Sequence, residues 1–270
     1  MRRSPLILRI VVLAYVAVLI GAPVVFLYQQ AFARGLGAYW SALSDPQMVA
    51  AIELTLKVAV VAVPLNVAFG VGASLWIVRR PSWASRLLDT FIDVPLAISP
   101  IIIGLVLELA YASNGWFGSP LAKLGWQVIF SFPGIVLASI FVSLPLVTRQ
   151  VIPLLREVGD HQEQTASTLG AGPIRIFFSV TMRQISWATA YGVTLTLARV
   201  IGEYGAVLIV SGNIAYLTQT LTLNIGANFD NFNNYQGFVG ASLLATASII
   251  VLVFLGFARN KERVRLEYST

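Results

Sequence analysis

The chain has 270 residues, of which 57% are hydrophobic and 11% are charged, and its formal net charge is +6. Soluble domains usually contain about 45–50% apolar and about 25% charged residues, so this composition argues against a soluble protein and for a bundle of membrane helices. The chain contains no cysteine. Disulfides and thiolate metal sites are therefore excluded.

Six segments are long and apolar enough to cross a membrane, and they place residues 1–270 in a single transmembrane domain. Each is close to the roughly 20 residues that a helix needs to cross a hydrocarbon core of about 30 Å. A transmembrane β-barrel would instead show short segments of alternating polarity. The predicted fold class is therefore all-α, with six transmembrane helices. The predicted spans are residues 6–28, 56–78, 87–111, 132–155, 187–210 and 237–258.

The first segment has two possible interpretations. Basic residues, an apolar run and the sequence Ala31-Phe32-Ala33 imitate a cleavable signal peptide. The apolar run is longer than that of a typical signal, however, and five more spans follow it. We therefore expect an uncleaved first span.

The basic residues predict how the spans are oriented. One set of connections holds fourteen of the 18 Lys and Arg residues, whereas the opposite set holds only Arg34 and Lys123. Because cytoplasmic loops carry the excess of Lys and Arg, we expect both termini and the loop of residues 156–186 in the cytoplasm. This bias also accounts for the net charge, so the sequence indicates no nucleic-acid partner. The fourteen residues are Arg2, Arg3, Arg9, Arg79, Arg80, Arg86, Arg149, Arg156, Arg175, Arg183, Arg259, Lys261, Arg263 and Arg265.

The loop of residues 156–186 is expected to contain two short helices. Asp160 and Glu163 have the spacing of a capping box, and Gly170 suits the end of the first helix. Pro173 suits the first position of the second helix. Apolar residues then recur at helical spacing as one stripe, which either caps the bundle at the membrane face or docks on a partner. The stripe consists of Ile174, Phe177, Phe178, Thr181 and Ile185.

Arg199 and Glu203 lie within the fifth predicted span. A charge at such a depth costs on the order of 2.5–3.5 kcal/mol on insertion scales, and such residues usually face a bundle interior or a water-filled path. Their spacing of four residues puts them on one helix face. They form either an ion pair that fixes helix packing or part of a gate or path. We expect the pair to fix helix packing and to take part in gating. Gly192, Gly202 and Gly205 permit close helix approach on this span.

Other charged residues near the spans have simpler expected roles. Glu53 and Lys57 are expected to form an exposed pair near the outer end of the second span. Asp89 and Asp93 are expected to complement the positive end of a helix dipole at the start of the third span. Glu108 is expected to reach the membrane interface from the end of that span.

Motifs of enzymes are missing from the sequence. The one histidine, His161, lies in the loop and has no second histidine with which to form a zinc site. A glycine-rich loop that would cradle phosphate is also absent. We therefore expect no catalytic residue, no metal ligand and no cofactor bound by this chain.

The loop, followed by LARVIGEYGAVLIVSGNI at residues 197–214, resembles the permease subunits of ATP-binding-cassette importers. In that family, a Glu-Ala-Ala sequence followed by three residues and Gly forms coupling helices that dock in a cleft of the ATPase. Ala166 and Gly170 match the pattern, whereas Gln164 and Thr165 stand where Glu and Ala are usual.

The loop departs from the family pattern at a second place, since Met182-Arg183 stands where Leu-Pro is usual. The resemblance still implies a loop that couples to an ATPase. Within it, Glu163 is either only a helix cap or an acidic contact supplied one position early.

The resemblance covers nearly the whole chain and narrows to the W-type permease subunits of sulfate/thiosulfate importers. Related molybdate and tungstate permeases share the segment around Arg199, so a molybdate/tungstate permease is the alternative. A second alternative is a secondary transporter that uses Arg199 and Glu203 as an ion-coupling pair. The similar segments are residues 44–66, 91–106, 113–118 and 130–155.

The resemblance implies a type I importer permease (MetI-like) fold in the cytoplasmic (inner) membrane. It implies import of an oxyanion by alternating access, driven by ATP-Mg bound to separate ATPase subunits. The implied partners are these subunits, a homologous second permease, a periplasmic or lipid-anchored sulfate-binding protein, and membrane lipid.

Overall fold

The computed structural model describes residues 4–267, and every regular element within them is a helix. The predicted all-α fold class is therefore confirmed. Arg2 and Arg3, which entered the prediction of orientation, lie outside the described residues. So do the side chains of Arg259, Lys261, Arg263 and Arg265.

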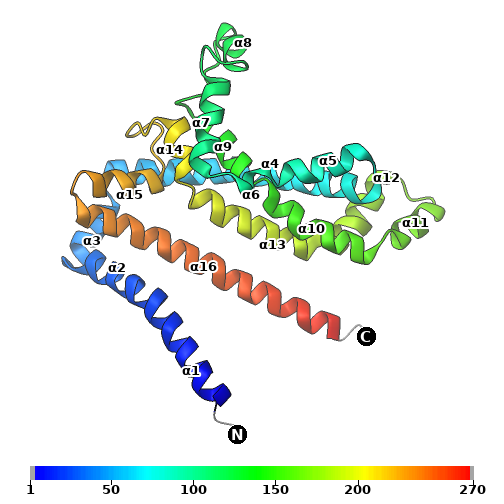
Figure 1. Cartoon of the computed structure of the whole chain (residues 1–270), viewed down its shortest axis with the longest axis horizontal. Coiled ribbons are helices and arrows are strands. Elements are labelled where there is room, and N and C mark those ends of the chain that lie inside the picture. The colour runs from blue at the N-terminus through cyan, green and yellow to red at the C-terminus, as the bar shows by residue number, and fades with distance from the viewer. Residues whose placement is uncertain (1–3, 268–270) are drawn as a thin grey trace.

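Four helices form the centre of the molecule and run along its longest dimension (Figure 1). In chain order, the central helices are α4 (Pro46–Arg79), α10 (Pro145–Val158), α13 (Met182–Ile201) and α16 (Asn234–Glu267). Of these, α13 packs against α4 and α10, and also against α16. We name the two ends of this bundle by the short helices found there. The α11 end, named after α11 (His161–Thr168), holds the last residues of α4 and the first of α13. The α15 end, named after α15 (Leu221–Asp230), holds the first residues of α4 and α16.

Close packing in the centre depends on glycine at two helix crossings. A Cβ atom added at Gly70 of α4 would lie 2.6 Å from the Cβ atom of Val147 on α10, and one at Gly192 of α13 would lie 2.9 Å from the Cα atom of Val147. Both distances are too short for non-bonded carbons, so only glycine lets α4 and α13 approach α10 this closely. Small residues at such crossings are typical of membrane helices.

The first helical stretch is less enclosed. It is formed by α1 (Ser4–Val16), the π-helical turn η1 (Ala17–Gly21) and α2 (Ala22–Phe32). In Figure 1, α2 lies beside α16 and α1 diverges from the bundle. None of the most apolar part of residues 11–32 is buried within the chain. A short helix, α3 (Gly35–Leu43), leads from there to α4.

Four of the six predicted spans coincide with continuous apolar helices. By length and composition, the helices able to cross a membrane are Val11–Phe32, Pro46–Arg79, Phe132–Val158 and Asn234–Val251. The third of these combines α9 (Phe132–Ser143) with α10. The other two predicted spans are bent pairs, and within residues 4–267 the number of candidate spans reaches six if each pair is one span.

The third predicted span is divided into α5 (Trp83–Ile92), α6 (Val94–Ala97) and α7 (Pro100–Tyr111), with a bend of 113°. Ile98 and Ser99 at the break have ψ angles of 140° and 136°. Pro100 causes this extended geometry at Ser99, because a proline disfavours the helical conformation of the residue before it. As a result, α7 and α8 (Gly118–Lys123) project from the side of the bundle (Figure 1).

The fifth predicted span is also interrupted. It consists of α13 and α14 (Gly205–Ser211), whose axes differ by 55°. The chain then passes through a loop into α15 (Leu221–Asp230) and returns along α16. No proline lies at this break. It is held instead by side-chain contacts of Glu203.

Candidate functional site

Two short helices project at the α11 end, as the sequence predicts. The first is α11 (His161–Thr168), which ends before Gly170, and the second is α12 (Pro173–Ile176). Gly170 has a φ angle of +82°, a left-handed conformation that glycine adopts without a steric penalty. The loop therefore has regular secondary structure, with a defined turn between its two helices.

The capping box predicted at the start of α11 does not form. The Asp160 side chain makes no capping hydrogen bond. Glu163 turns instead towards the end of α4, where its Oε1 atom accepts hydrogen bonds from Arg79 Nη2 at 3.1 Å and from the Thr181 hydroxyl at 2.7 Å. A charge-assisted contact of this kind is stronger than a hydrogen bond between neutral groups. Glu163 therefore belongs to a contact between helices.

The predicted apolar stripe divides into two faces. Phe177, Thr181 and Ile185 pack into the chain, and Ile185 is fully buried. Ile174 and Phe178 point outward, with 77% and 66% of their surface exposed. The division follows from η2 (Phe177–Thr181), a π-helical turn between α12 and α13. Its wider turn changes the angular position of later residues, so ordinary helical spacing does not hold across it.

The other residues expected to couple lie on or next to α11. Gln164, Thr165 and Gly170 are exposed, whereas Ala166 is half-buried. Leu169, at the end of the same helix, is 83% exposed. Leu169, Ile174 and Phe178 are thus the strongly exposed large apolar residues of this loop, and we call them the α11–η2 surface.

The break between α13 and α14 is organised by Glu203. This side chain is buried, and its Oε1 atom accepts the backbone N–H of Ala206 at 3.0 Å, in the first turn of α14. Its Oε2 atom lies 3.2 Å from Nη2 of Arg199. One carboxylate thus caps the helix after the break and pairs with the arginine before it. This explains a break without proline, because the freed backbone groups find partners.

Two further contacts hold this break in place. The Thr222 hydroxyl donates to the backbone carbonyl of Glu203 at 2.7 Å. A Cβ atom at Gly205 would lie 3.2 Å from Pro100 Cβ and 3.3 Å from the Ile101 backbone nitrogen, so α14 starts close to α7. Arg199 keeps 43% of its side chain exposed beside its buried partner. The pair therefore presents the guanidinium of Arg199 at the surface of the chain. The expected pairing of Arg199 with Glu203 is confirmed.

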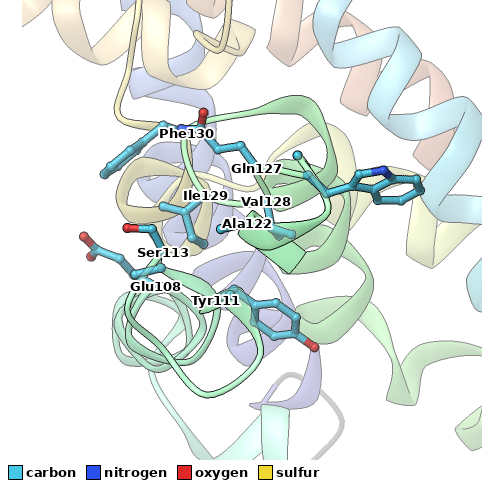
Figure 2. A pocket seen from close by; sticks show the side chains of 12 residues that line it. Glu108, Tyr111, Ser113, Ala122, Gln127, Val128, Ile129 and Phe130 are labelled. Carbon is cyan, nitrogen blue, oxygen red and sulfur yellow. The ribbon is translucent and has the colours of Figure 1, made fainter. Parts of the chain in front are cut away.

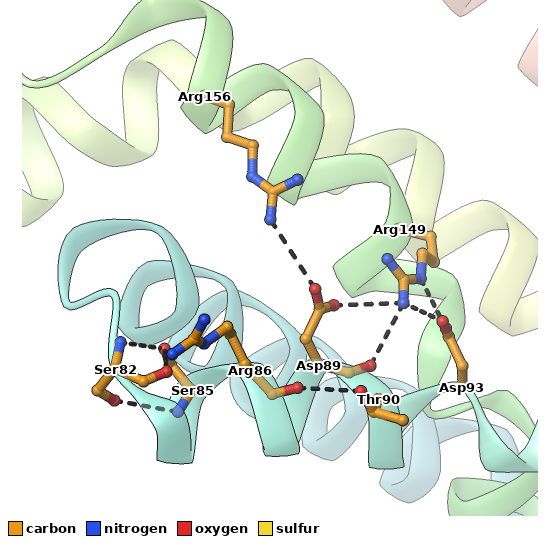
Figure 3. A network of polar contacts seen from close by, with 8 residues as sticks. All are labelled: Ser82, Ser85, Arg86, Asp89, Thr90, Asp93, Arg149 and Arg156. Atoms are coloured by element: carbon orange, nitrogen blue, oxygen red, sulfur yellow. Dashed lines mark hydrogen bonds and ion pairs between the residues drawn. The ribbon is translucent and has the colours of Figure 1, made fainter.

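A second group of charges joins α5 to α10 (Figure 3). The guanidinium of Arg149 binds both carboxylate oxygens of Asp93 and lies 3.2 Å from the carboxylate of Asp89. Arg156 lies 3.8 Å from the other oxygen of Asp89. The prediction that both residues complement a helix start is wrong for Asp89, which lies in the last turn of α5. Asp93 ends α5 and immediately precedes α6 (Val94–Ala97), but its side chain binds Arg149 and makes no capping hydrogen bond to α6. The two carboxylates hold α5 against α10 instead.

A network of side-chain amides centred on the buried Gln219 lies near the α15 end. The Gln219 side chain accepts from the Gln47 amide at 2.7 Å and the Asn224 amide at 3.0 Å, and it donates to Asn213 at 2.9 Å. Gln219 is 5% exposed, so these bonds satisfy groups that water does not reach. The network ties the loop after α14 to the start of α4, and sequence reasoning did not predict it.

The family described as "Binding-protein-dependent transport system inner membrane component" matches residues 66–264. The chain belongs to this family. It is therefore a permease, a membrane component of a transport system rather than an enzyme, as the sequence predicted.

Relatives and solved structures agree with the assignment. The permease is 42% identical over 249 residues to the sulfate transport system permease protein CysW of Synechococcus elongatus, covering 92% of this chain and 87% of the relative. It is 35% identical to CysT of Escherichia coli strain K12, covering 92% and 90%. A bacterial transporter for the acidic polysaccharide alginate shares its fold, with a TM-score of 0.76, 16% identity and coverage of 97% and 96%. The resemblance to W-type permeases and the type I importer fold are confirmed.

A cavity of about 370 Å³ lies between the end of α7, α8 and the loop that follows α8 (Figure 2). Its lining comes only from residues 108–130, with Glu108 and Tyr111 from α7 and Gln127 and Val128 from the following loop. Glu108, expected at the membrane interface, thus borders this cavity. Neither the Arg199–Glu203 pair nor the α11–η2 surface contributes a residue to its lining, so the cavity is separate from both.

Proposed function

We propose that the chain is the membrane-spanning permease subunit of an ATP-driven importer of sulfate or thiosulfate. The observation that carries the proposal is the exposed α11–η2 surface in a member of a binding-protein-dependent transport family. The substrate class is taken from the sulfate transport permeases to which the chain is similar over about nine-tenths of its length.

The α11–η2 surface is the proposed site of ATPase docking. Leu169, Ile174 and Phe178 expose most of their apolar area on a short polar segment outside the predicted spans. Exposed apolar patches of this kind mark sites of interaction. Gln164, Thr165, Ala166 and Gly170 form the helix and turn that carry this surface, and Glu163 fixes the helix to the bundle.

The proposed orientation puts the α11 end in the cytoplasm. Arg79, Arg80, Arg156 and Arg175 gather at this end or in its loop, whereas the opposite connections contain few basic residues. Both termini then lie in the cytoplasm, and the α15 end faces outward. A periplasmic or lipid-anchored binding protein would deliver the oxyanion there.

Arg199 and Glu203 are the proposed gate or path residues. The half-exposed guanidinium of Arg199 makes the nearby surface favourable for a doubly charged anion, while Glu203 holds it in place. A homologous second permease would cover this face and complete the path. ATP-Mg would bind to the separate ATPase subunits, whose closure moves the helices by alternating access.

Uptake of labelled sulfate and of labelled molybdate in a strain that lacks the chain, with and without the chain restored, tests this proposal. We expect restored sulfate uptake that requires the ATPase subunits. Preferential uptake of molybdate would favour the molybdate/tungstate alternative. Uptake that survives loss of the ATPase would favour a secondary transporter and would contradict the proposal.

A further inference from the structure

The contact between Arg79 and Glu163 joins more elements than any other ion pair at the α11 end. Arg79 is the last residue of α4, and Glu163 lies in the first turn of α11. The Arg79 Nη2 atom donates to Glu163 Oε1 at 3.1 Å, and its Nε atom lies 3.0 Å from Oε2 without the alignment of a hydrogen bond. Both oxygens of this carboxylate therefore face the guanidinium at the end of α4.

Each of the two residues also forms a hydrogen bond to a further element. Arg79 Nη2 donates to the backbone carbonyl of Gly159 at 2.7 Å, immediately after α10. Glu163 Oε1 accepts the hydroxyl of Thr181 at 2.7 Å, at the end of η2 and immediately before α13. One polar contact thus links α11 to the ends of α4 and α10 and to the start of α13, the three helices that pack together in the centre of the molecule.

The contact is well enclosed for a pair of charges at the end of a bundle. The side chains of Arg79 and Glu163 are 20% and 18% exposed, and Thr181 is buried. The Glu53–Lys57 pair, by contrast, is 62% exposed on both sides. Exposed ion pairs contribute little to stability because water and salt screen them. Removing one partner of an enclosed, hydrogen-bonded pair is costly, because the other charge is left unpaired.

Apolar packing does little to hold α11 in place. None of its residues is buried. Its remaining neighbours are mainly α12 and η2, which belong to the same loop. The position of α11 relative to the long helices therefore depends chiefly on Glu163.

We propose that Arg79, Glu163 and Thr181 form a joint that transmits movement of α11 to α4 and α13. This inference rests on the proposed function, because a load on α11 requires an ATPase that docks on the α11–η2 surface. Glu163 is then a positioning residue that faces the bundle. The ATPase would instead contact the exposed side of the loop, including Leu169 and Ile174.

The joint predicts a particular defect when it is broken. In Arg79→Gln or Glu163→Gln, the ATPase subunits should still co-purify with the permease and hydrolyse ATP, because the α11–η2 surface is intact. Sulfate uptake per ATP hydrolysed should fall about tenfold, within the range of measured couplings between sites. Thr181→Val should have a smaller effect in the same direction, and Thr181→Ser should retain wild-type coupling because it keeps the hydroxyl.

A double-variant experiment separates the joint from two unrelated defects. If the two residues act as one unit, Arg79→Gln/Glu163→Gln should be about as impaired as either single variant, and not impaired by the product of the two effects. Arg80→Gln and Glu157→Gln are matched controls, because both residues are exposed and form no ion pair within the described side chains. They should transport at wild-type coupling.

Three outcomes would overturn the joint. These are wild-type coupling in Glu163→Gln, independent effects of the two substitutions, and loss of ATPase co-purification in Glu163→Gln, which would make Glu163 a docking residue. Wild-type protein measured in parallel distinguishes failure of the proposed function. If wild-type protein shows no ATP-dependent sulfate uptake, the function is wrong. If it transports and the variants behave in one of these three ways, only the joint is wrong.

Discussion

Two ion pairs in this permease have the same spacing in the sequence but different surroundings in the structure. Glu53 and Lys57 lie on the continuous helix α4, 2.7 Å apart, and both side chains are 62% exposed. Arg199 and Glu203 flank the end of α13, and the Glu203 side chain is only 2% exposed. A spacing of four residues therefore predicts that two charges meet, whereas the helix break decides whether their contact organises the fold.

The largest expected effect on folding comes from Glu203→Ala. This substitution removes the acceptor for the Ala206 N–H and the partner of Arg199. We expect it to lower the free energy of unfolding by on the order of 2–3 kcal/mol, from loss of a helix cap and of a buried ion-pair partner. The unfolding temperature of purified permease in detergent would measure the loss. An unchanged value would mean that Glu203 does not organise the break.

Glu203→Gln divides this effect between its two causes. The amide oxygen can still accept the Ala206 N–H, while the negative charge beside Arg199 is lost. We expect about half the destabilisation of Glu203→Ala, roughly 1 kcal/mol, because a neutral acceptor replaces a charged one. Measured in the same detergent, a loss as large as that of Glu203→Ala would show that the charge, and not the cap, carries the contact.

The smallest expected effect comes from Glu53→Gln. Because both members of the Glu53–Lys57 pair are mostly exposed, the change should alter the free energy of unfolding by less than about 0.5 kcal/mol. Sulfate uptake should stay at the wild-type rate. A defect as large as that of Glu203→Gln would remove the distinction between the two pairs.

The all-α fold and four continuous spans follow from the sequence, because long apolar runs need no knowledge of their neighbours to form membrane helices. The break before Pro100 could also have been predicted, since proline restricts the residue before it. The break after Ile201 could not, because it depends on Thr222 and on the start of α7, which the fold brings to Glu203.

The candidate sites were only partly predictable for a similar reason. The two helices of the loop are marked by Gly170 and Pro173, which act locally. The partner of Glu163 is Arg79, 84 residues earlier in the chain, and no local pattern indicates such a contact. The π-helical turn η2 likewise divides a stripe that has regular spacing in the sequence.

Uptake of labelled sulfate by Arg199→Ala and Lys57→Ala, compared at equal permease levels in the same deletion strain, tests the functional side of this comparison most directly. If Arg199 lines the path of the anion, uptake by Arg199→Ala should fall at least about tenfold, a loss expected when a charged contact to an anion is removed. Lys57→Ala should transport like wild type. Equal, wild-type uptake by both variants would contradict the account.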